Sequence, residues 1–315
     1  MTAENEQPAS GAGQRAGYVA LVGRPNVGKS TLLNTLIGQK LSIVTPRAQT
    51  TRQAILGIDT TEDAQLVFVD TPGLLEPAYL LQHSMLHAAL AAVKDADLVL
   101  LLLDATRPDD LPPAEPLELL RARRDRLFVA INKIDIGRPE AIERLAQWSV
   151  RELGVEPHRI SAATGEGVGA LRAALVDALP ASPFLYPPDE LATQPVRFFV
   201  AELIRETVFE RYEEEVPYSV AVTIEEFREA TDPVYIRATI HVERDSQKAI
   251  LIGRGGVGIR ELGRSARQKI EAFLDARVYL DLWVKVTPGW RRNAPTLRRL
   301  GYAVPETAAR DRRRR

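Results

Sequence analysis

GRPNVGKST, residues Gly23–Thr31, stands between the apolar run Tyr18–Val22 and the helix-forming sequence LLNTLIG. This strand–GxxxxGK[ST]–helix order is typical of a phosphate-binding loop. Its glycines let backbone N–H groups turn inward around phosphate oxygens, and the N-terminus of the next helix adds positive charge. Lys29 is predicted to neutralise the β- and γ-phosphates, and the Ser30 hydroxyl to complete a Mg²⁺ coordination sphere. The residues expected to contact the nucleotide are Gly23, Arg24, Pro25, Asn26, Val27, Gly28, Lys29, Ser30 and Thr31.

Two adjacent threonines, Thr50 and Thr51, occupy the polar segment that follows this unit. Behind a phosphate-binding loop, a threonine at this place is expected to close over the γ-phosphate and Mg²⁺. Loop threonines otherwise serve mostly in turns, so the assignment depends on the upstream motif. We expect Thr51, rather than Thr50, to be the switch residue and a Mg²⁺ ligand.

A second contact with phosphate and metal is predicted at the end of the apolar run QLVFVD. The DTPG sequence that begins at its last residue has the DxxG form, in which the carboxylate holds the Mg²⁺ shell and the glycine N–H bonds the γ-phosphate. DTPG alone is a common turn, and its place at a strand tip favours the functional interpretation. The residues expected to contact the nucleotide are Asp70, Thr71, Pro72 and Gly73.

Two positions bear on the rate of hydrolysis. Leu74 stands where many signalling GTPases have a water-orienting glutamine, which predicts slow intrinsic turnover. Asn26 resembles the position that, in a subset of bacterial GTPases, coordinates a potassium ion doing the charge work of an arginine finger. Stimulation by K⁺ is therefore a hypothesis for this chain. The residues assigned to catalysis are Lys29, Thr51, Gly73 and Asn26.

An NKxD sequence follows the apolar run LFVAI, at the carboxyl end of a predicted strand, where open α/β sheets bind ligands. Asp135 is expected to accept hydrogen bonds from the N1–H and the exocyclic amine of guanine, a pair of donors that adenine lacks. Asn132 and Lys133 are expected to pack over the base and pin the neighbouring loops.

A weaker motif, SAATG, follows a short predicted strand at residues 158–160. It resembles the loop whose backbone N–H reads the guanine O6, and its residues are Ser161, Ala162 and Ala163. In this order the five motifs resemble the GTP-binding domain of translation-factor-related small GTPases over residues 17–181. The resemblance implies a P-loop α/β fold with a mostly parallel, doubly wound sheet, and it implies GTP, GDP and Mg²⁺ as ligands. A metabolic P-loop kinase, the alternative enzyme class, has no use for NKID.

Residues 182–196 are rich in proline and lack periodicity, so they are predicted to link two domains. Beyond them the sequence predicts a helix at 197–214, strands at 219–227 and 234–244, a short helix, a GxxG loop, a longer helix and a strand at 277–286. This order matches the α-first, type II KH arrangement, an α+β fold that binds single-stranded nucleic acid. Residues 197–303 are therefore predicted to form a KH domain with a C-terminal extension.

The GxxG loop lets a nucleic acid approach the backbone closely, because a side chain would obstruct it. Three arginines at one-turn spacing on the next helix add a basic ridge that can contact phosphates. The residues assigned to RNA binding are Gly253, Arg254, Gly255, Gly256, Arg260, Arg264 and Arg267. Trp283 and Trp290 are expected to pack at a strand end and against a helix rather than to stack on bases.

The net charge of −1 hides an asymmetry along the chain. Residues 250–315 hold 16 Lys and Arg against 6 Asp and Glu, which leaves 25 against 36 for residues 1–249. A polyanion is therefore expected to bind the C-terminal part. Residues 1–16 are predicted to form a disordered lead, and residues 304–315 a basic tail.

The absence of cysteine excludes disulfides and thiolate metal sites and fits the cytoplasm. No apolar run reaches the roughly 18 residues that a membrane-spanning helix needs. The polar, acidic N-terminus is unlike a secretion signal. We expect a monomeric cytoplasmic protein.

A GTPase domain followed by a type II KH domain resembles the Era family of bacterial ribosome-assembly GTPases. The resemblance covers residues 17–303 and is carried by GRPNVGKST, AQTTR, VPYSV, DLWVKV and LGY. It implies binding to the 3′ end of small-subunit (16S) ribosomal RNA, a role in maturation of the 30S particle, and peripheral association with the cytoplasmic face of the cell membrane. The longer acidic lead and the Arg-rich tail depart from the family.

Two further expectations follow. GTP with Mg²⁺ is expected to order the segments around Thr51 and Gly73. Their altered packing would open the GxxG surface to RNA, and hydrolysis would reverse this change.

The alternative function left open is a membrane-associated signalling GTPase whose C-terminal domain binds protein rather than RNA.

Overall fold

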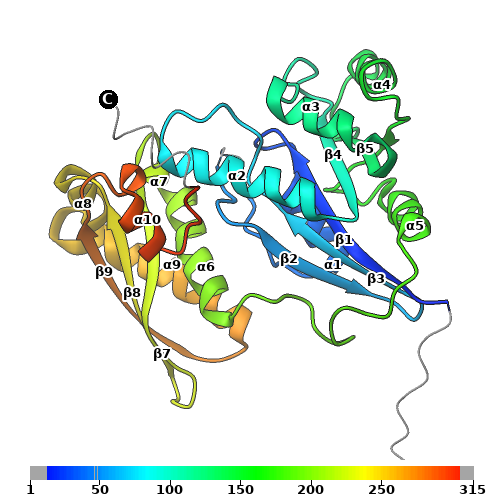
Figure 1. Ribbon diagram of the computed structural model, residues 1–315. Helices are drawn as coiled ribbons and strands as arrows, with labels where there is room; N and C mark the ends of the chain where they lie inside the picture. The colour runs from blue at the N-terminus through cyan, green and yellow to red at the C-terminus, as the bar shows by residue number, and fades with distance from the viewer. Residues whose placement is uncertain (1–12, 46, 48, 306–315) are drawn as a thin grey trace, which may run out of the picture.

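The computed structural model describes residues 13–45, 47 and 49–305 (Figure 1). The first twelve residues of the predicted lead, and the predicted tail from residue 306, lie outside the described residues. Within the described chain there are two domains, and the C-terminal helix of the second lies back against the first. No described helix is both long and apolar enough to cross a lipid bilayer.

Six strands of the described chain form the sheet of the first domain, in the order β2-β3-β1-β4-β5-β6. Neighbouring strands are parallel except β2 and β3. A parallel sheet is covered on both faces, so its strands are near-continuously apolar, and β4 is buried at every position. The strands are β1 Arg15–Gly23, β2 Ile55–Thr60, β3 Ala64–Asp70, β4 Leu98–Asp104, β5 Leu127–Asn132 and β6 His158–Arg159.

Helices cover both faces of this sheet. Val19 and Leu21 of β1 pack with α1 and α5, whereas the alternate residues Ala20 and Val22 pack with α2, α3 and α4. This doubly wound arrangement confirms the predicted fold class, and it brings the loops after the parallel strands to one edge of the sheet. The helices are α1 Lys29–Ile37, α2 Leu80–Asp95, α3 Ala114–Ala122, α4 Pro139–Leu153 and α5 Val168–Ala178, with a 3₁₀ turn at Arg124–Arg126.

The second domain contains a sheet in the order β7-β8-β9, with β7 antiparallel and β9 parallel to β8. Every second residue of β8 from Val234 to Val242 is buried, and these side chains pack with α6, α8 and α9. The order of elements confirms the predicted KH fold. They are α6 Val196–Arg211, α7 Val216–Ser219, β7 Ala221–Arg228, β8 Val234–Val242, α8 Asp245–Ile252, a 3₁₀ turn at Arg254–Gly256, α9 Val257–Leu274, β9 Val278–Val286, a 3₁₀ turn at Trp290–Arg292 and α10 Ala294–Arg299.

Some boundaries differ from the prediction. β1 begins at Arg15, inside the predicted lead, because Arg15 pairs with Ala64 of β3 and forms a bridge with Ala181. α6 ends at Arg211 instead of residue 214, and the four-residue α7 was missed because so short a helix shows no periodicity. The segment before α6 lies against the first domain, where the backbone N–H of Ile58 donates to the carbonyl of Leu191 at 2.9 Å.

An apolar cluster joins the two domains. Its side chains come from the segment after DTPG, from α2, from β7 and from the C-terminal segment: Leu75, Leu80, Leu81, Met85, Ala221, Trp290, Leu297 and Tyr302. Trp290 is fully buried, and its indole N–H donates to the carbonyl of Ser219 at 2.8 Å. The packing role expected for Trp290 is confirmed.

The packing role expected for Trp283 is wrong. Its side chain is 60% exposed. The residues on either side of it in β9, Leu282 and Val284, pack with the helices, so alternation turns Trp283 to the opposite face of the sheet.

Candidate functional site

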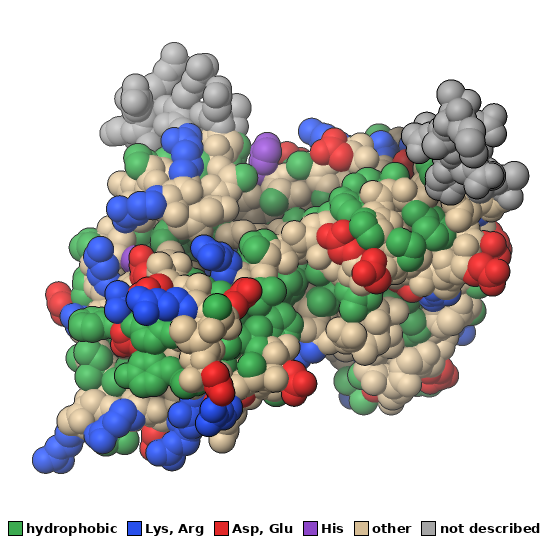
Figure 2. All heavy atoms as spheres, turned by 90° about the horizontal axis from the view of Figure 1, so that it is seen from below, with side chains coloured by type: hydrophobic (Ala, Val, Ile, Leu, Met, Phe, Trp, Pro, Cys, Tyr) green, Lys and Arg blue, Asp and Glu red, His purple; other side chains and the backbone are tan. Residues whose placement is uncertain are grey.

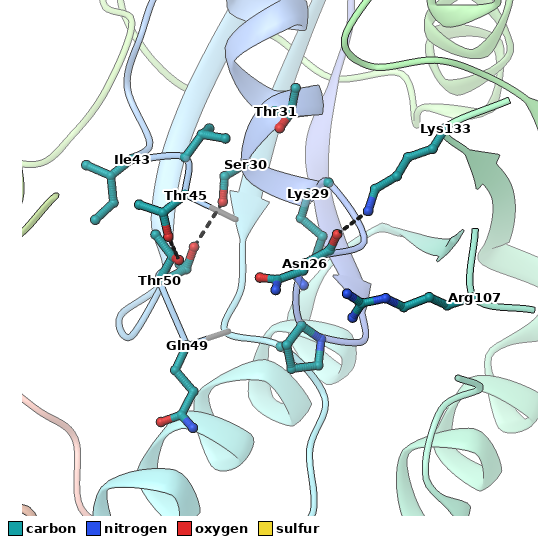
Figure 3. Close-up of a pocket in the computed structure, with 15 residues that line it drawn as sticks. Asn26, Lys29, Ser30, Thr31, Ile43, Thr45, Gln49, Thr50, Arg107 and Lys133 are labelled. Carbon is teal, nitrogen blue, oxygen red and sulfur yellow. Dashed lines mark hydrogen bonds between the residues drawn. The ribbon is translucent and has the colours of Figure 1, made fainter. Parts of the chain in front are cut away.

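A cavity of about 440 Å³ lies at the sheet edge where β1 ends (Figure 3). It is surrounded by the loop between β1 and α1, by residues 43–45 and 49–51, and by the loops after β3, β4 and β5. The predicted site residues that line it are Pro25, Asn26, Gly28, Lys29, Ser30, Thr31, Thr51, Gly73 and Lys133. The other predicted nucleotide residues lie outside this lining, and they are Gly23, Arg24, Val27, Asp70, Thr71, Pro72, Asn132, Asp135, Ser161, Ala162 and Ala163.

Glycine is required where the loop turns. Gly23 has a φ of 152° and Gly28 a φ of 100°, a region that residues with a Cβ rarely adopt. A Cβ on Gly28 would lie 2.2 Å from the side-chain nitrogen of Asn132. That nitrogen donates a 2.8 Å hydrogen bond to the carbonyl of Val27, so the loop is held tightly against the end of β5.

Three oxygen-bearing side chains converge beside α1. Ser30 Oγ donates to Asp70 Oδ2 at 2.7 Å and lies 3.0 Å from Thr51 Oγ1. Asp70 is fully buried, and its other oxygen, Oδ1, has no hydrogen-bond partner in the described chain. Such a buried, unpaired carboxylate oxygen is costly, and hydroxyl and carboxylate oxygens are ligands that Mg²⁺ prefers. The residues present therefore fit a Mg²⁺ ion held together with nucleotide phosphates.

Burial shifts the pKa of both charged groups in this part of the site. It raises the pKa of the Asp70 carboxyl, although Lys29 and the surrounding hydroxyl groups act in the opposite direction. Burial also lowers the pKa of Lys29 to about 8, against the attraction of Asp70. Lys29 Nζ donates to the carbonyls of Gly23 and Arg24, each at 3.1 Å. A phosphate in the cavity would supply the negative charge that favours the protonated lysine.

The two adjacent threonines make different contacts. The Thr51 hydroxyl lies beside Ser30 and donates to Asp70 Oδ2 at 3.4 Å. The Thr50 hydroxyl instead lies 2.7 Å from that of Thr45. The geometry supports the preference for Thr51 as the metal ligand.

The DTPG segment packs closely against the phosphate-binding loop. A Cβ on Gly73 would lie 2.8 Å from the backbone nitrogen of Pro25, so only glycine fits here. The next backbone N–H, of Leu74, donates to the carbonyl of Gly23 at 2.9 Å. The Leu74 side chain is buried in the core, where it does not meet water in the cavity.

The NKID residues tie three loops together. Lys133 Nζ donates to the carbonyl of Asn26 at 2.7 Å and to Asp104 Oδ2 at 2.6 Å. Asn132 Oδ1 accepts the backbone N–H of Ala162 at 2.8 Å. Asp135 is exposed beside them. The structure thus gives Asn132 and Lys133 the expected pinning role, and it leaves the Asp135 carboxylate accessible to a base.

The SAATG loop offers one available donor. The backbone N–H of Ser161 bonds to the carbonyl of Glu166 at 2.9 Å, and that of Ala162 bonds to Asn132. Among these three residues in the described chain, Ala163 is left with a backbone N–H that bonds to no protein group. Ala163 is therefore the member of the triplet best placed to read a guanine O6.

A second cavity, a groove of about 510 Å³, runs between α9 and β9 in the second domain. Arg260, Arg264 and Arg267 line one side, and Tyr279 lines the other. All three arginines are exposed. Figure 2 shows Lys and Arg side chains gathered over this domain, whereas Asp and Glu are frequent over the first domain. The predicted basic ridge is thus one wall of a groove.

The GxxG loop begins beside this groove. Gly253 has a φ of 68°, and a Cβ there would lie 2.9 Å from the backbone nitrogen of Gly258. Gly255 and Gly256 also have positive φ, and nothing lies within 4 Å of the Cβ position of either. Arg260 steadies the loop because its guanidinium donates to the Gly255 carbonyl at 3.1 Å. The loop therefore presents bare backbone to an incoming strand.

Arg52 connects the cavity with the second domain, and sequence reasoning assigned it no role. Its guanidinium is buried and donates to the carbonyls of Val220 at 2.5 Å and Pro217 at 3.2 Å. Arg205 of α6 reaches in the other direction and donates to the carbonyl of Thr50. Burial lowers the pKa of Arg52, and the like charge of Arg205 adds to this effect. The segment that bears Thr50 and Thr51 is therefore held by the KH domain.

Arg107 was also missed by sequence reasoning. It lies after β4, lines the cavity and points into it in Figure 3. Its place after a strand of a parallel sheet is a signal that could have found it, since ligands bind at that edge.

Models of two protein families match the chain. Residues 18–133 match the 50S ribosome-binding GTPase family, and residues 215–291 match the KH domain. Both matches lie inside the domains seen in the structure.

Curated relatives match nearly the whole chain. GTPase Era of Geobacter metallireducens is 42% identical over 91% of this chain and 98% of its own length, and GTPase Era of a Nostoc species is 41% identical over 93% of this chain and 91% of its own length. Two solved structures also match: an Aquifex aeolicus Era variant bound to GDP and AlF4⁻, and Era in complex with MgGDPNP and nucleotides 1506–1542 of 16S ribosomal RNA. Each has a TM-score of 0.85 and covers 92% of this chain and 100% of its own, with 39% and 40% identity respectively.

Proposed function

The chain belongs to the Era family of GTPases, and from this membership we propose that it binds the 3′ region of 16S ribosomal RNA and assists maturation of the 30S subunit. GTP hydrolysis is the activity of the family and of this chain. One observation carries the proposal. Thr51 lines the phosphate cavity and its hydroxyl contacts Ser30 and Asp70, while the guanidinium of the adjacent Arg52 donates to carbonyls of the KH domain. Two consecutive residues thus join the proposed nucleotide site to the KH domain, which carries the proposed RNA site.

In the nucleotide site, we assign phosphate binding to Lys29 and the backbone of the Gly23–Thr31 loop, and guanine recognition to Asp135. Ser30, Thr51 and Asp70 would hold Mg²⁺, which when bound neutralises charge on the phosphates. The N–H of Gly73 would bond the γ-phosphate. Leu74 cannot orient a water molecule, which supports slow intrinsic turnover. Our hypothesis of K⁺ stimulation places a K⁺ ion beside Asn26, where it would add positive charge at the phosphates.

In the RNA site, single-stranded RNA would pass the open backbone of Gly253–Gly256, with its phosphates toward Arg254, Arg260, Arg264 and Arg267. Bases would then face the groove between α9 and β9. The 16S fragment bound by the related Era protein supports ribosomal RNA as the partner. The match of residues 215–291 to the KH domain model supports binding of single-stranded nucleic acid by this domain.

We infer that nucleotide state controls this RNA site. A γ-phosphate draws Thr51 and Gly73 toward itself, and both segments contact the second domain: one through Arg52, the other through Leu75 and its packing with Trp290. Hydrolysis removes the γ-phosphate and these attractions with it. RNA would therefore bind more tightly to the GTP state than to the GDP state.

Footprinting on precursor 16S ribosomal RNA, with GDP and with GDPNP, tests the proposed partner. We expect protection of the 3′ region, stronger with GDPNP. Crosslinking from the Gly253–Gly256 loop separates this function from the signalling alternative: RNA crosslinks support the ribosomal role, whereas crosslinks to protein alone contradict it.

We further propose that the protein acts as a monomer in the cytoplasm, with peripheral contact at the cytoplasmic face of the membrane. Sedimentation velocity tests the monomer. Flotation with vesicles containing anionic lipid tests the membrane contact, since the basic C-terminal part would bind such vesicles and be released by salt.

A further inference from the structure

Arg107, in the loop after β4, brings a positive charge to the phosphate cavity. Figure 3 shows its guanidinium pointing toward the loop at Asn26. Within the part of the chain that the structure describes, that guanidinium has no hydrogen-bond or ion-pair partner. No motif identified in the sequence includes it. A cation that faces an anion-binding cavity without a counterion is placed to meet a ligand's charge.

The segment that carries Arg107 is fastened to the phosphate-binding loop. Arg24, inside that loop, pairs through Nε with Asp110 Oδ1 at 2.6 Å. The backbone N–H of Asp110 in turn donates to the carbonyl of Arg107 at 3.0 Å. At its other end, Asp104 Oδ1 accepts the backbone N–H of Thr106 at 2.9 Å, and Asp104 Oδ2 accepts Lys133 Nζ at 2.6 Å. The backbone around Arg107 is thus held in place on both sides.

We propose that Arg107 is a catalytic residue of GTP hydrolysis, an arginine finger supplied by the chain itself. Its guanidinium reaches across the loop at Pro25 and Asn26 and contacts the phosphates of bound GTP. The inference rests on the proposed nucleotide site around Lys29 and Asp70. In other GTPases an arginine supplied from the same chain or from a partner stabilises the charge of the transition state.

The step that Arg107 assists is the ordinary displacement at phosphorus. A bond forms between the oxygen of water and the γ-phosphorus, and the bond between that phosphorus and the β–γ bridging oxygen breaks. The bonding pair stays on the bridging oxygen of GDP, and the proton lost by the water passes to the phosphate product. Arg107 is unchanged at the end, because it only stabilises negative charge on the bridging and γ-phosphate oxygens.

The other residues of the site leave room for this contribution. Leu74 is buried and orients no water. Lys29 is already engaged at the β- and γ-phosphates in the proposed ground state, and burial lowers its pKa. Arginine, in contrast, keeps its charge at any physiological pH and offers two donors to two oxygens at once.

The test compares Arg107→Ala and Arg107→Lys with the matched control Arg144→Ala. Arg144 is exposed on α4 and pairs with Asp109 of the same segment, so the control removes an equal charge and loosens the same region. Single-turnover hydrolysis is measured in KCl and Mg²⁺, together with affinity for GDP alone and for GDP with aluminium fluoride, a mimic of the transferring phosphoryl group.

We expect Arg107→Ala to slow hydrolysis by about 100-fold and to weaken the aluminium fluoride complex by a similar factor, with GDP affinity nearly unchanged. Arg107→Lys should recover part of the loss, and Arg144→Ala should behave as wild type. The inference is overturned if Arg107→Ala hydrolyses GTP as fast as wild type, or if a loss of GDP affinity accounts for its slower rate. Either result leaves the proposed nucleotide site standing. Absence of guanine nucleotide binding by wild-type protein would overturn the proposed nucleotide site and the inference with it.

Discussion

Arg52 Nη1 lies 2.5 Å from the carbonyl oxygen of Val220, although the two residues belong to different domains. The residue before Arg52 is Thr51, whose hydroxyl lies 3.0 Å from that of Ser30 in the phosphate cavity. One short segment is therefore bound at one end by the nucleotide site and at the other by the KH domain. Arg52 Nε and Arg205 Nη1 are buried without hydrogen-bond partners in the described chain. Burying these donors unpaired costs free energy, so a small shift between the two domains should change the stability of this contact.

Asp135→Asn should change which base the protein binds. The carboxylate accepts from the N1–H and the amine of guanine, and an amide can match only one of these donors while its own N–H₂ faces the other. Xanthine carries an oxygen in place of the amine, so the variant should prefer xanthosine diphosphate over GDP by at least about tenfold. Competition binding with both nucleotides measures this. If the variant keeps the wild-type preference for GDP, Asp135 does not read the base.

Replacing NaCl by KCl should raise the rate of GTP hydrolysis. A K⁺ ion beside Asn26 would add positive charge at the phosphates, which Na⁺, with its smaller radius, would supply less well. Steady-state phosphate release at equal ionic strength measures the effect, and Asn26→Ala should abolish it. Equal rates of wild-type protein in the two salts would dispose of the potassium hypothesis.

Nucleotide affinity should fall as the pH rises through the Lys29 pKa of about 8. Phosphate favours the protonated lysine, so binding takes up a proton wherever the free protein has lost it. Near pH 7 the lysine is already charged and affinity should be level, whereas near pH 9 GDP should bind about tenfold more weakly. Calorimetry in two buffers of different ionisation heat measures the proton uptake. Affinity that is the same near pH 7 and pH 9 would contradict the assignment of Lys29.

Arg264→Ala should weaken RNA binding most at low salt. Arg264 is exposed in the groove beside α9 and is expected to contact one phosphate. Loss of one such contact reduces the slope of log affinity against log salt concentration by about 0.7 for a single strand. Arg277→Ala is the control, because Arg277 is exposed in the same domain and pairs with Asp232. Equal effects of the two variants would show that only overall charge matters.

Much of the nucleotide site could be predicted because phosphate chemistry constrains local sequence. Gly28 and Lys29 occur at fixed spacing since the loop must turn tightly and present an ammonium group, and the structure brings Ser30, Thr51 and Asp70 together as expected. The fold was predictable for a similar reason, since uninterrupted apolar strands such as β4 alternate with amphipathic helices.

Residues whose roles depend on distant packing could not be predicted. Arg52 acts through carbonyls about 170 positions away in the chain, and no local pattern encodes that contact. Arg107 faces the cavity only because the sheet places the end of β4 beside that of β1. Trp283 was predictable in principle: alternation along β9 assigns it to the face opposite Leu282 and Val284, and weighing tryptophan as a core residue led to the wrong expectation.

One measurement tests whether the nucleotide site controls the RNA site. It is the affinity of the protein for 3′-terminal fragments of 16S ribosomal RNA, with GDPNP and with GDP, for wild type and for Arg52→Gln. Wild-type protein should bind the RNA about tenfold or more tightly with GDPNP, within the usual range of coupling between sites. Arg52→Gln should keep its nucleotide affinity and lose most of that difference. Equal RNA affinity of wild-type protein in the two nucleotide states would contradict the control of RNA binding by nucleotide.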